Sequence, residues 1–203
     1  MPPLFDLTCI VFAGGKSSRM GQDKSLLPFA GYPTLTQYQY DRLRPLFRRI
    51  CISAKESDKF NFDADVIPDI VETGIYAPTA GFASVFEHLD DERLFVLSVD
   101  APFIDREQIA ALVAADGPEL DAVIARTASG SHPMCGIYHR SLAPRFSRML
   151  REDNHRLGQL LQQSNTRFVP FDDEIPFANL NHPHEYQEAC RLTRDGDIVP
   201  SER

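Results

Sequence analysis

A glycine-rich, basic segment follows directly after an apolar run near the start of this chain. The apolar run is Thr8 to Phe12, and the segment Ala13 to Ser25 reads AGGKSSRMGQDKS. Gly14, Gly15 and Gly21 lack a Cβ atom, so the backbone can turn tightly and point amide N–H groups at phosphate oxygens. A strand that runs into such a loop favours an α/β fold with a ligand at the end of the strand.

Basic side chains in the same segment add positive charge to this loop. They belong to Lys16, Arg19 and Lys24. Arg offers a planar fork for two phosphate oxygens and Lys offers a point charge, so Arg19 and Lys24 are not interchangeable. The alternative is an ordinary glycine turn with solvated charges, and the length of the pattern argues against it. The segment therefore predicts a loop that holds a nucleotide triphosphate.

Two commoner phosphate loops do not match the segment. A Walker A loop that ends at Gly15-Lys16-Ser17 needs a glycine at position 10, where the chain has Ile10. The G-x-G-x-x-G spacing of a dinucleotide-binding loop is also absent. The loop is therefore of another type.

Short apolar runs alternate with helical patterns along the chain, which is typical of β–α units and a mostly parallel sheet. The predicted strands are Thr8 to Phe12, Arg49 to Ser53, Arg93 to Ser98, Ala122 to Arg126 and Gly136 to His139. Apolar helical stripes lie within Phe82 to Leu89, Ile109 to Val113 and Leu157 to Leu161, and helix caps are expected at Thr34 and Asp105. We predict a three-layer α/β/α sandwich with a mostly parallel, Rossmann-like sheet. It forms a single domain over residues 1–194, with a frayed tail over 195–203.

Composition excludes several classes of protein. The net charge of −8 argues against a nucleic-acid partner, because such proteins usually present a basic surface. No apolar stretch approaches the length of a membrane span, and Met1 to Asp6 lacks the basic start of a secretory signal. We therefore expect a cytoplasmic protein with no membrane partner. The cysteines show no C-x-x-C spacing, so buried, reduced thiols are expected.

Asp100 is the second candidate site residue. It follows an apolar strand and precedes Ala101 and Pro102, where the chain must leave the sheet. Because ligands of open α/β sheets bind outside the carboxyl ends of the strands, Asp100 and Lys24 are expected to face one another across one crevice. A carboxylate there suits Mg²⁺, which binds few protein oxygens and shares its other positions between phosphates and water. An Asp that caps the next turn is the alternative.

Asn179 and Asn181 form the third candidate patch. Alternation places both amides on one face of an extended segment, just before Pro183 starts a helix. Paired amides can donate and accept hydrogen bonds, which suits a polar ring or a phosphate. A turn with an Asn cap is the alternative reading of this patch.

These three motifs together resemble the MobA family, the molybdenum cofactor guanylyltransferases. The motifs are AGGKSSRMGQDKS, VDAPF at Val99 to Phe103 and NLNHPHEY at Asn179 to Tyr186, and the resemblance runs from about Thr8 to Leu192. The family's first signature reads approximately LAGGxSxRMGxDK, and Phe12 stands at its usual Leu. The resemblance implies a fold of the nucleotide-diphospho-sugar transferase type. It also implies a nucleotidyltransferase.

The resemblance further implies a role for each matching residue. It makes Arg19, Lys24 and Asp100 catalytic, with Asp100 as the ligand of Mg²⁺ or of Mn²⁺ as a substitute. Residues implied to contact the nucleotide are Phe12, Ala13, Gly14, Gly15, Lys24, Ser53, Asp69, Gly81 and Asp100. Residues implied to face the pterin are Arg156, Asn179 and Asn181. At position 182 the chain has His182 where the family has a Thr that usually caps the following helix.

The implied reaction joins GMP to molybdopterin. The terminal phosphate of molybdopterin attacks the α-phosphate of GTP, and pyrophosphate leaves. A phosphate monoester is largely dianionic at neutral pH, so no side-chain nucleophile is needed and the protein aligns the phosphates and neutralises their charge. Asp69 is expected to accept hydrogen bonds from guanine N1–H and the exocyclic amine, and a solvated loop carboxylate is the alternative. Transient contact with molybdoenzymes or their chaperones is a further implied partnership.

Other functions stay open at this point. They include a CTP-dependent molybdopterin cytidylyltransferase and a nucleotidyltransferase for a sugar or polyol phosphate on the same fold. Three contrasts with the cytidylyltransferase branch favour GTP: the Gly14-Gly15 pair, the presence of Asp23, and Asn179 with Asn181 in place of D-x-D. A non-catalytic nucleotide-binding regulatory module is the alternative from another class. The intact charged residues of the motifs argue against it.

Overall fold

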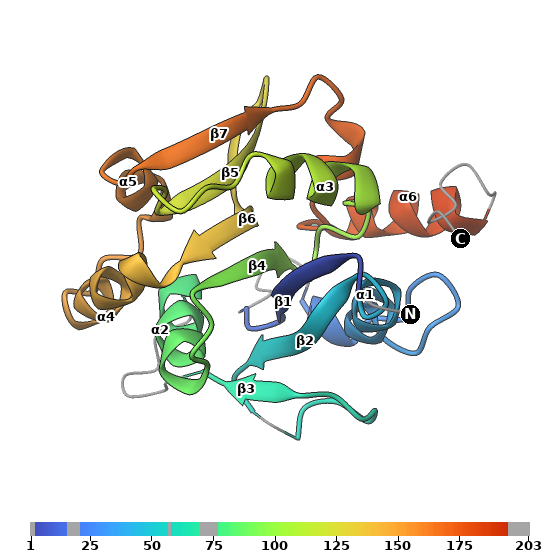
Figure 1. Ribbon diagram of the computed structural model, residues 1–203. Helices are drawn as coiled ribbons and strands as arrows, with labels where there is room; N and C mark the ends of the chain where they lie inside the picture. Colours follow the sequence, from blue (N-terminus) through green and yellow to red (C-terminus); the bar gives the residue numbers. More distant parts are fainter. Residues whose placement is uncertain (1–2, 16–20, 57, 70–76, 195–203) are drawn as a thin grey trace.

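The computed structural model describes residues 3–15, 21–56, 58–69 and 77–194, which form one sheet with helices on both faces (Figure 1). The strands are β1 (Phe5–Phe12), β2 (Phe47–Ala54), β3 (Val66–Pro68), β4 (Arg93–Ser98), β5 (Ala122–Thr127), β6 (Gly130–His139) and β7 (Thr166–Pro170). The α-helices are α1 (Leu35–Leu43), α2 (Pro78–His88), α3 (Arg106–Ala114), α4 (Ala143–Arg151), α5 (Leu157–Gln162) and α6 (Pro183–Arg194). Short 3₁₀ helices are η1 (Lys24–Leu26), η2 (Arg140–Leu142) and η3 (Ile175–Phe177).

The sheet is mostly parallel, as predicted. Its strand order is β3-β2-β1-β4-β6-β5-β7, and β6 runs antiparallel to both of its neighbours while the other pairs are parallel. β1 lies between β2 and β4, with Phe12 paired to Ser53 on one side and to Ser98 on the other. The carboxyl ends of these three strands therefore meet at one edge.

Helices bury both faces of the sheet, which explains why β1 reads as one apolar run. Cys9 and Val11 pack in the core beneath α1, α3 and α6, whereas Ile10 and Phe12 pack in the core beneath α2, α4 and α5. Figure 1 shows these two groups of helices on opposite sides of the sheet. The predicted three-layer α/β/α sandwich is confirmed.

Both expected helix caps are present. The hydroxyl of Thr34 accepts a hydrogen bond from the Gln37 N–H at 3.0 Å and begins α1. Asp105 and Gln108 form a reciprocal capping box at the start of α3. These caps satisfy N–H groups that have no partner inside the helix.

Three elements were missed from the sequence, and the two strands among them have weak sequence patterns. β3 has only three residues, and β7 lies at the edge of the sheet with most of its residues partly or fully exposed. In α4, Phe146 and Met149 are the only buried residues, and arginines occupy much of the remaining surface. The two strands have too few buried apolar positions to show an alternation, whereas Phe146, Met149 and Leu150 of α4 stand at helical spacing and were overlooked.

β6 begins at Gly130, earlier than the predicted start at Gly136. Pro133, in the part of the strand that was missed, has no N–H for a sheet ladder. In the structure the pairing of β5 with β6 shifts between Ile124 and Ala125, opposite this part of the strand. Such a shift lets the strand continue past a residue that has no backbone N–H to donate to the neighbouring strand.

Buried, reduced thiols were predicted, and three of the cysteines are buried and free. Cys9, Cys51 and Cys135 are buried free thiols, and Cys190 is partly buried. Burial raises the pKa of Cys51 and of Cys135 to about 12, so both stay protonated at neutral pH. These thiols are part of the core.

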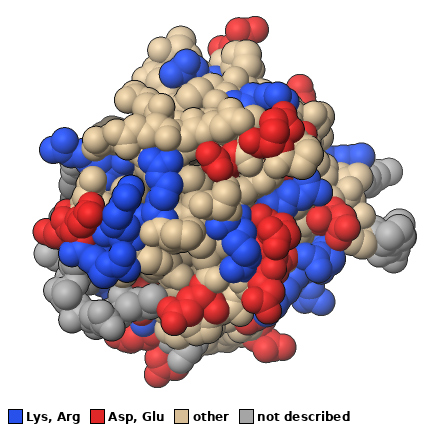
Figure 2. All heavy atoms as spheres, turned by 60° about the vertical axis from the view of Figure 1, so that its left-hand side comes forward, with Lys and Arg blue, Asp and Glu red and all other residues tan. Residues whose placement is uncertain are grey.

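Two further findings concern the surface. In the described ranges, none of the helices has the length and apolar character needed to cross a membrane. Figure 2 shows Lys and Arg side chains lying close to Asp and Glu side chains over one face. The net charge of −8 is thus not spread over that face as a uniformly acidic surface.

Candidate functional site

The ends of β1, β2 and β3 hold the first group of predicted site residues together. The Ala13 N–H donates to the Ser53 carbonyl oxygen at 2.8 Å, and the Ser53 hydroxyl donates to the Asp69 carboxylate at 2.7 Å. The Asp69 N–H donates to the Ala54 carbonyl oxygen at 2.7 Å. Asp69 is therefore held beside the start of the glycine-rich loop.

Two glycines leave space around this group. A Cβ on Gly14 would lie 2.6 Å from the Asp69 carboxylate, and a Cβ on Gly81 would lie 2.6 Å from the Ser53 hydroxyl and 2.7 Å from the Phe12 ring. Neither glycine has a positive φ, so close approach rather than backbone conformation requires them. The structure thus brings together six of the residues predicted to contact a nucleotide, namely Phe12, Ala13, Gly14, Ser53, Asp69 and Gly81.

The carboxyl group of Asp69 is a weaker acid than a free Asp side chain. Burial raises the pKa of its carboxyl group, against the opposing effects of the Ser53 hydroxyl and of the positive charges of Lys59 and Lys55. The carboxylate form is therefore less stable here than in water, and a ligand that donates hydrogen bonds to it would favour ionisation.

The ammonium group of Lys24 lies among three oxygen atoms. It pairs with the Asp100 carboxylate, and it donates to Oδ1 of Asn181 at 3.1 Å and to the Leu180 carbonyl oxygen at 3.5 Å. The Leu180 N–H donates in turn to the Asp100 carbonyl oxygen at 2.9 Å. The predicted meeting of Lys24 and Asp100 is confirmed, and Asn181 joins the same cluster.

Lys59 is a residue of this region that the sequence analysis missed. Its ammonium group donates to the Ala13 carbonyl oxygen at 2.9 Å and pairs with Oδ2 of Asp23, also at 2.9 Å. Lys59 lies in the connection between β2 and β3, where no motif marks it. No signal in the sequence alone points to these contacts.

A hollow of about 160 Å³ opens beside Asn179. Its walls include Ile104, Met134, Phe177 and the ring of His132, which lies 4.8 Å from the Phe177 ring. Burial lowers the pKa of His132 despite the opposing charge of Glu174, so the ring is neutral at neutral pH. A mainly apolar hollow with a few polar groups suits a flat heteroaromatic ring.

The missing Thr cap before α6 has a replacement. The Glu185 carboxylate accepts from the Asn181 N–H at 2.7 Å and from the His182 N–H at 2.8 Å. Although burial acts in the opposite direction, these two N–H groups lower the pKa of Glu185. The carboxylate in the first turn of the helix thus holds the Asn179–Asn181 segment in place of Thr.

The remaining predicted residues differ in their placement. Arg156 stands at the start of α5, and no contact joins its side chain to Asn179 or Asn181 in the part of the chain that the structure describes. Its neighbour His155 instead contacts the Thr79 hydroxyl at 2.5 Å, at the start of α2. Arg19 lies outside the described residues, as does Lys16. Gly15 has open space where a Cβ would stand.

The oxygen atoms around Lys24 are of the kind that Mg²⁺ prefers. Among the described residues there is no cluster of three or more His, Cys, Asp or Glu side chains able to hold a metal ion. Mg²⁺ commonly needs only one or two carboxylates, with phosphates and water as its other ligands. The Asp100 carboxylate, only 11% exposed and already paired with a cation, fits that requirement.

Comparisons with known proteins support the family that the sequence motifs resemble. The family model for the MobA-like NTP transferase domain matches residues 9–167. A molybdenum cofactor guanylyltransferase of Campylobacter jejuni (strain RM1221) is 38% identical over 185 residues, which cover 91% of this chain and 96% of that protein.

Solved structures share the fold. Molybdopterin-guanine dinucleotide biosynthesis protein A from Archaeoglobus fulgidus superposes with a TM-score of 0.78 at 20% identity, over 93% of this chain and 100% of that chain. The 2-C-methyl-D-erythritol 4-phosphate cytidylyltransferase from Thermus thermophilus superposes with a TM-score of 0.70 at 14% identity, over 94% of this chain and 100% of that chain. At these identities the likeness concerns the fold alone, which proteins named for different reactions share.

Proposed function

The chain belongs to the MobA-like NTP transferase family, and on that premise we propose that it is a molybdenum cofactor guanylyltransferase. It transfers GMP from GTP to the terminal phosphate of molybdopterin and releases pyrophosphate. The relative that is 38% identical over nearly its whole length carries this name, which supports the assignment more strongly than the shared fold does.

The single observation that carries the proposal is the position of the Lys24 ammonium group. It contacts Asp100 on the nucleotide side and Asn181 on the acceptor side. A nucleotidyl transfer needs the two substrates aligned at one point, with positive charge close to the phosphates. Lys24 stands at that point, so we assign it to the charge that develops on the reacting phosphates.

The chemistry requires no protein nucleophile. The terminal phosphate of molybdopterin is largely dianionic at neutral pH and attacks the α-phosphate of GTP. Mg²⁺ held by Asp100 would neutralise phosphate charge, with Mn²⁺ as a substitute ion. Arg19 and Lys24 supply the remaining positive charge, and the backbone from Phe12 to Gly15 lines the nucleotide.

Asp69 is the residue we assign to recognition of guanine. Its carboxylate can accept from N1–H and from the exocyclic amine of guanine, a pair of donors that cytosine lacks. The Ser53 hydroxyl donates to one of its oxygens at 2.7 Å, and the missing Cβ atoms of Gly14 and Gly81 let the carboxylate lie close to the backbone. This arrangement favours GTP over CTP.

The hollow beside Asn179 is where we place the ring of the acceptor. Its apolar walls and neutral His132 suit a pterin, and Asn179 can bond to the ring's polar edge. Arg156 is assigned to the same substrate by resemblance only. A cytoplasmic location and transient contact with molybdoenzymes or their chaperones complete the proposal.

The direct test is pyrophosphate release from GTP and from CTP, with Mg²⁺, in the presence of molybdopterin or of a panel of sugar 1-phosphates. Asp100→Asn should remove activity because it removes the charge of the carboxylate that faces Lys24. Asp65→Asn is a matched control, because Asp65 also pairs with a cation, Arg49, but lies outside the site.

Release from GTP with molybdopterin that persists in Asp65→Asn and disappears in Asp100→Asn supports the guanylyltransferase. Turnover only with CTP or only with a sugar phosphate would assign the protein to another activity of the same fold. Nucleotide binding without pyrophosphate release would indicate a regulatory module.

A further inference from the structure

The ammonium group of Lys59 joins two separate points of the glycine-rich segment. Its two contacts, with the Ala13 carbonyl oxygen and with the Asp23 carboxylate, are both 2.9 Å long. Ala13 precedes the first two glycines of the segment and Asp23 follows the third. The Lys59 side chain is only 12% exposed. One sheltered cation thus binds both ends of the loop that is proposed to hold the phosphates.

Lys59 extends from a packed part of the β2–β3 connection. Its ammonium group lies 5.5 Å from the centre of the Phe60 ring, and the Phe60 and Phe62 rings are 5.7 Å apart. Phe62 in turn packs 5.6 Å from the ring of Tyr40 in α1. Because these rings hold the connection against α1, less conformational entropy is lost when Lys59 makes its two contacts.

Asp23 carries the effect of Lys59 to the start of η1. While Oδ2 of Asp23 pairs with Lys59, Oδ1 accepts from the Ser25 N–H at 3.1 Å and from the Ser25 hydroxyl at 2.7 Å. Although burial acts to raise it, the hydrogen bonds from Lys59 and Ser25 lower the pKa of Asp23. Lys24 is the first residue of η1, so the direction in which its side chain leaves the backbone depends on this cap.

We propose that Lys59 is a positioning residue for the nucleotide: it holds the two ends of the glycine-rich loop together and, through Asp23, directs Lys24 toward Asp100. The identity of the nucleotide as GTP rests on the proposed function. Lys59 itself contacts no reacting atom. Removal of the Lys59 ammonium group takes away the hydrogen bond to the Ala13 carbonyl oxygen and the ion pair with Asp23. The loop then loses the contact that joins its ends.

The test compares Lys59→Met with Lys59→Arg and with Arg49→Met. Arg49 is a matched control because its guanidinium pairs with Asp65 in the same β2–β3 connection but contacts neither Ala13 nor Asp23. Calorimetric titration with GTP and steady-state kinetics are measured for each variant, together with the melting temperature.

We expect Lys59→Met to weaken GTP binding by about tenfold and to lower kcat as well, since hydrogen bonds to charged groups contribute at this level. Lys59→Arg, which keeps the positive charge and N–H donors, should retain more GTP affinity than Lys59→Met. Arg49→Met should bind GTP as wild type does. Normal binding by Lys59→Met, or an equal loss in Arg49→Met, would overturn the proposal.

Hydrogen exchange on the protein without nucleotide separates this inference from the proposed function. In Lys59→Met the amides of Ser25, Leu26 and Leu27 should exchange at least about tenfold faster, while amides of α1 keep their wild-type rates. If wild type binds no GTP, the proposed function fails and this exchange still decides the role of Lys59. Unchanged exchange at these three amides would overturn the positioning role whatever the ligand.

Discussion

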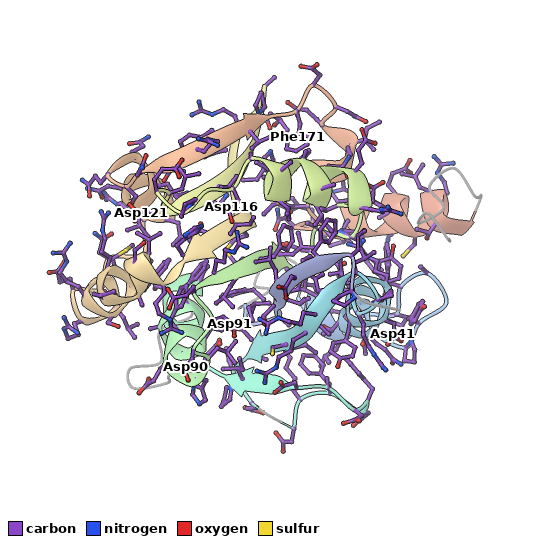
Figure 3. All side chains as sticks on the ribbon, viewed as in Figure 1. Asp41, Asp90, Asp91, Asp116, Asp121 and Phe171 are labelled. Atoms are coloured by element: carbon purple, nitrogen blue, oxygen red, sulfur yellow. The ribbon has the colours of Figure 1, made fainter. Side chains whose placement is uncertain are left out.

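The two ends of the central sheet both carry sheltered charges, but they are built differently. At the amino end, Asp116 is 1% exposed and accepts from Arg93 at 2.6 Å and from His139 at 2.8 Å. Close by, Asp91 accepts from the Thr8 hydroxyl at 2.7 Å and pairs with Arg48 at 2.5 Å. Figure 3 shows Asp91 and Asp116 on the same side of the molecule. These partners pair the charges at the amino end.

The carboxyl end of the same strands has charges next to open space. Lys24 pairs with Asp100 and Lys59 pairs with Asp23, as at the other end. Here, however, Gly14 and Gly81 remove side-chain volume, and a hollow opens beside Asn179. The comparison teaches that a sheltered ion pair alone does not mark a functional site. The space beside the pair does.

Asp116→Ala should produce the largest loss of stability while leaving function intact. It removes the partner of Arg93 and of His139 in a nearly dry place, so we expect about 3 kcal/mol less free energy of unfolding. Denaturant unfolding measures the loss, and turnover per folded molecule should match wild type. A drop in that turnover would mean that the two ends are not functionally separate.

Lys24→Ala should produce the opposite result at the other end. Loss of a charge partner in the transition state predicts turnover lower by roughly 10² or more, with a loss of stability below that of Asp116→Ala because Lys24 and Asp100 are both partly exposed. Arg93→Ala is the matched control, since it also removes a cation paired with a sheltered Asp. Activity of Lys24→Ala within a few fold of wild type would remove Lys24 from its assigned role.

Gly81→Ala tests the importance of space in a helix. A Cβ there would meet Ser53 and Phe12, so GTP affinity should fall by about tenfold even though Ala favours helix over Gly by about 1 kcal/mol. Gly158 in α5 has open space where an added Cβ would stand, so it provides the control. Gly158→Ala should raise stability and leave GTP affinity unchanged, as titration and thermal unfolding can show.

The smallest expected effect concerns pH. Because the folded-state pKa of Asp69 is raised above 3.8, the folded protein binds more protons than the unfolded chain between these two pKa values. Asp69 therefore lowers stability as pH rises through that window, and Asp69→Asn should remove this dependence. Guanine donors need the carboxylate, so GTP affinity should fall as pH drops through the raised pKa. A pH-independent affinity in wild type would contradict the assignment of Asp69 to guanine.

Much of the fold and part of the site follow from local sequence patterns. Apolar runs and helical stripes predict the sandwich, because burial on two faces of a sheet requires them. Gly14 and Asp100 are recognisable because each stands just after a strand, and Lys24 because it belongs to the same glycine-rich motif as Gly14. The edge strand β7 was missed because its burial depends on neighbours from other parts of the chain, whereas α4 was overlooked although its apolar residues stand at helical spacing.

By itself the sequence determined the α/β sandwich, the glycine-rich, basic character of the first loop and the acidic residue after β4, because these follow from local spacing and residue type. Only the tertiary structure decided that Asn181 bonds to Lys24 across 157 positions and that Lys59 bonds to Ala13 across 46. It also decided that Glu185 replaces a Thr cap. Such contacts depend on strand register and loop path, which local patterns do not encode.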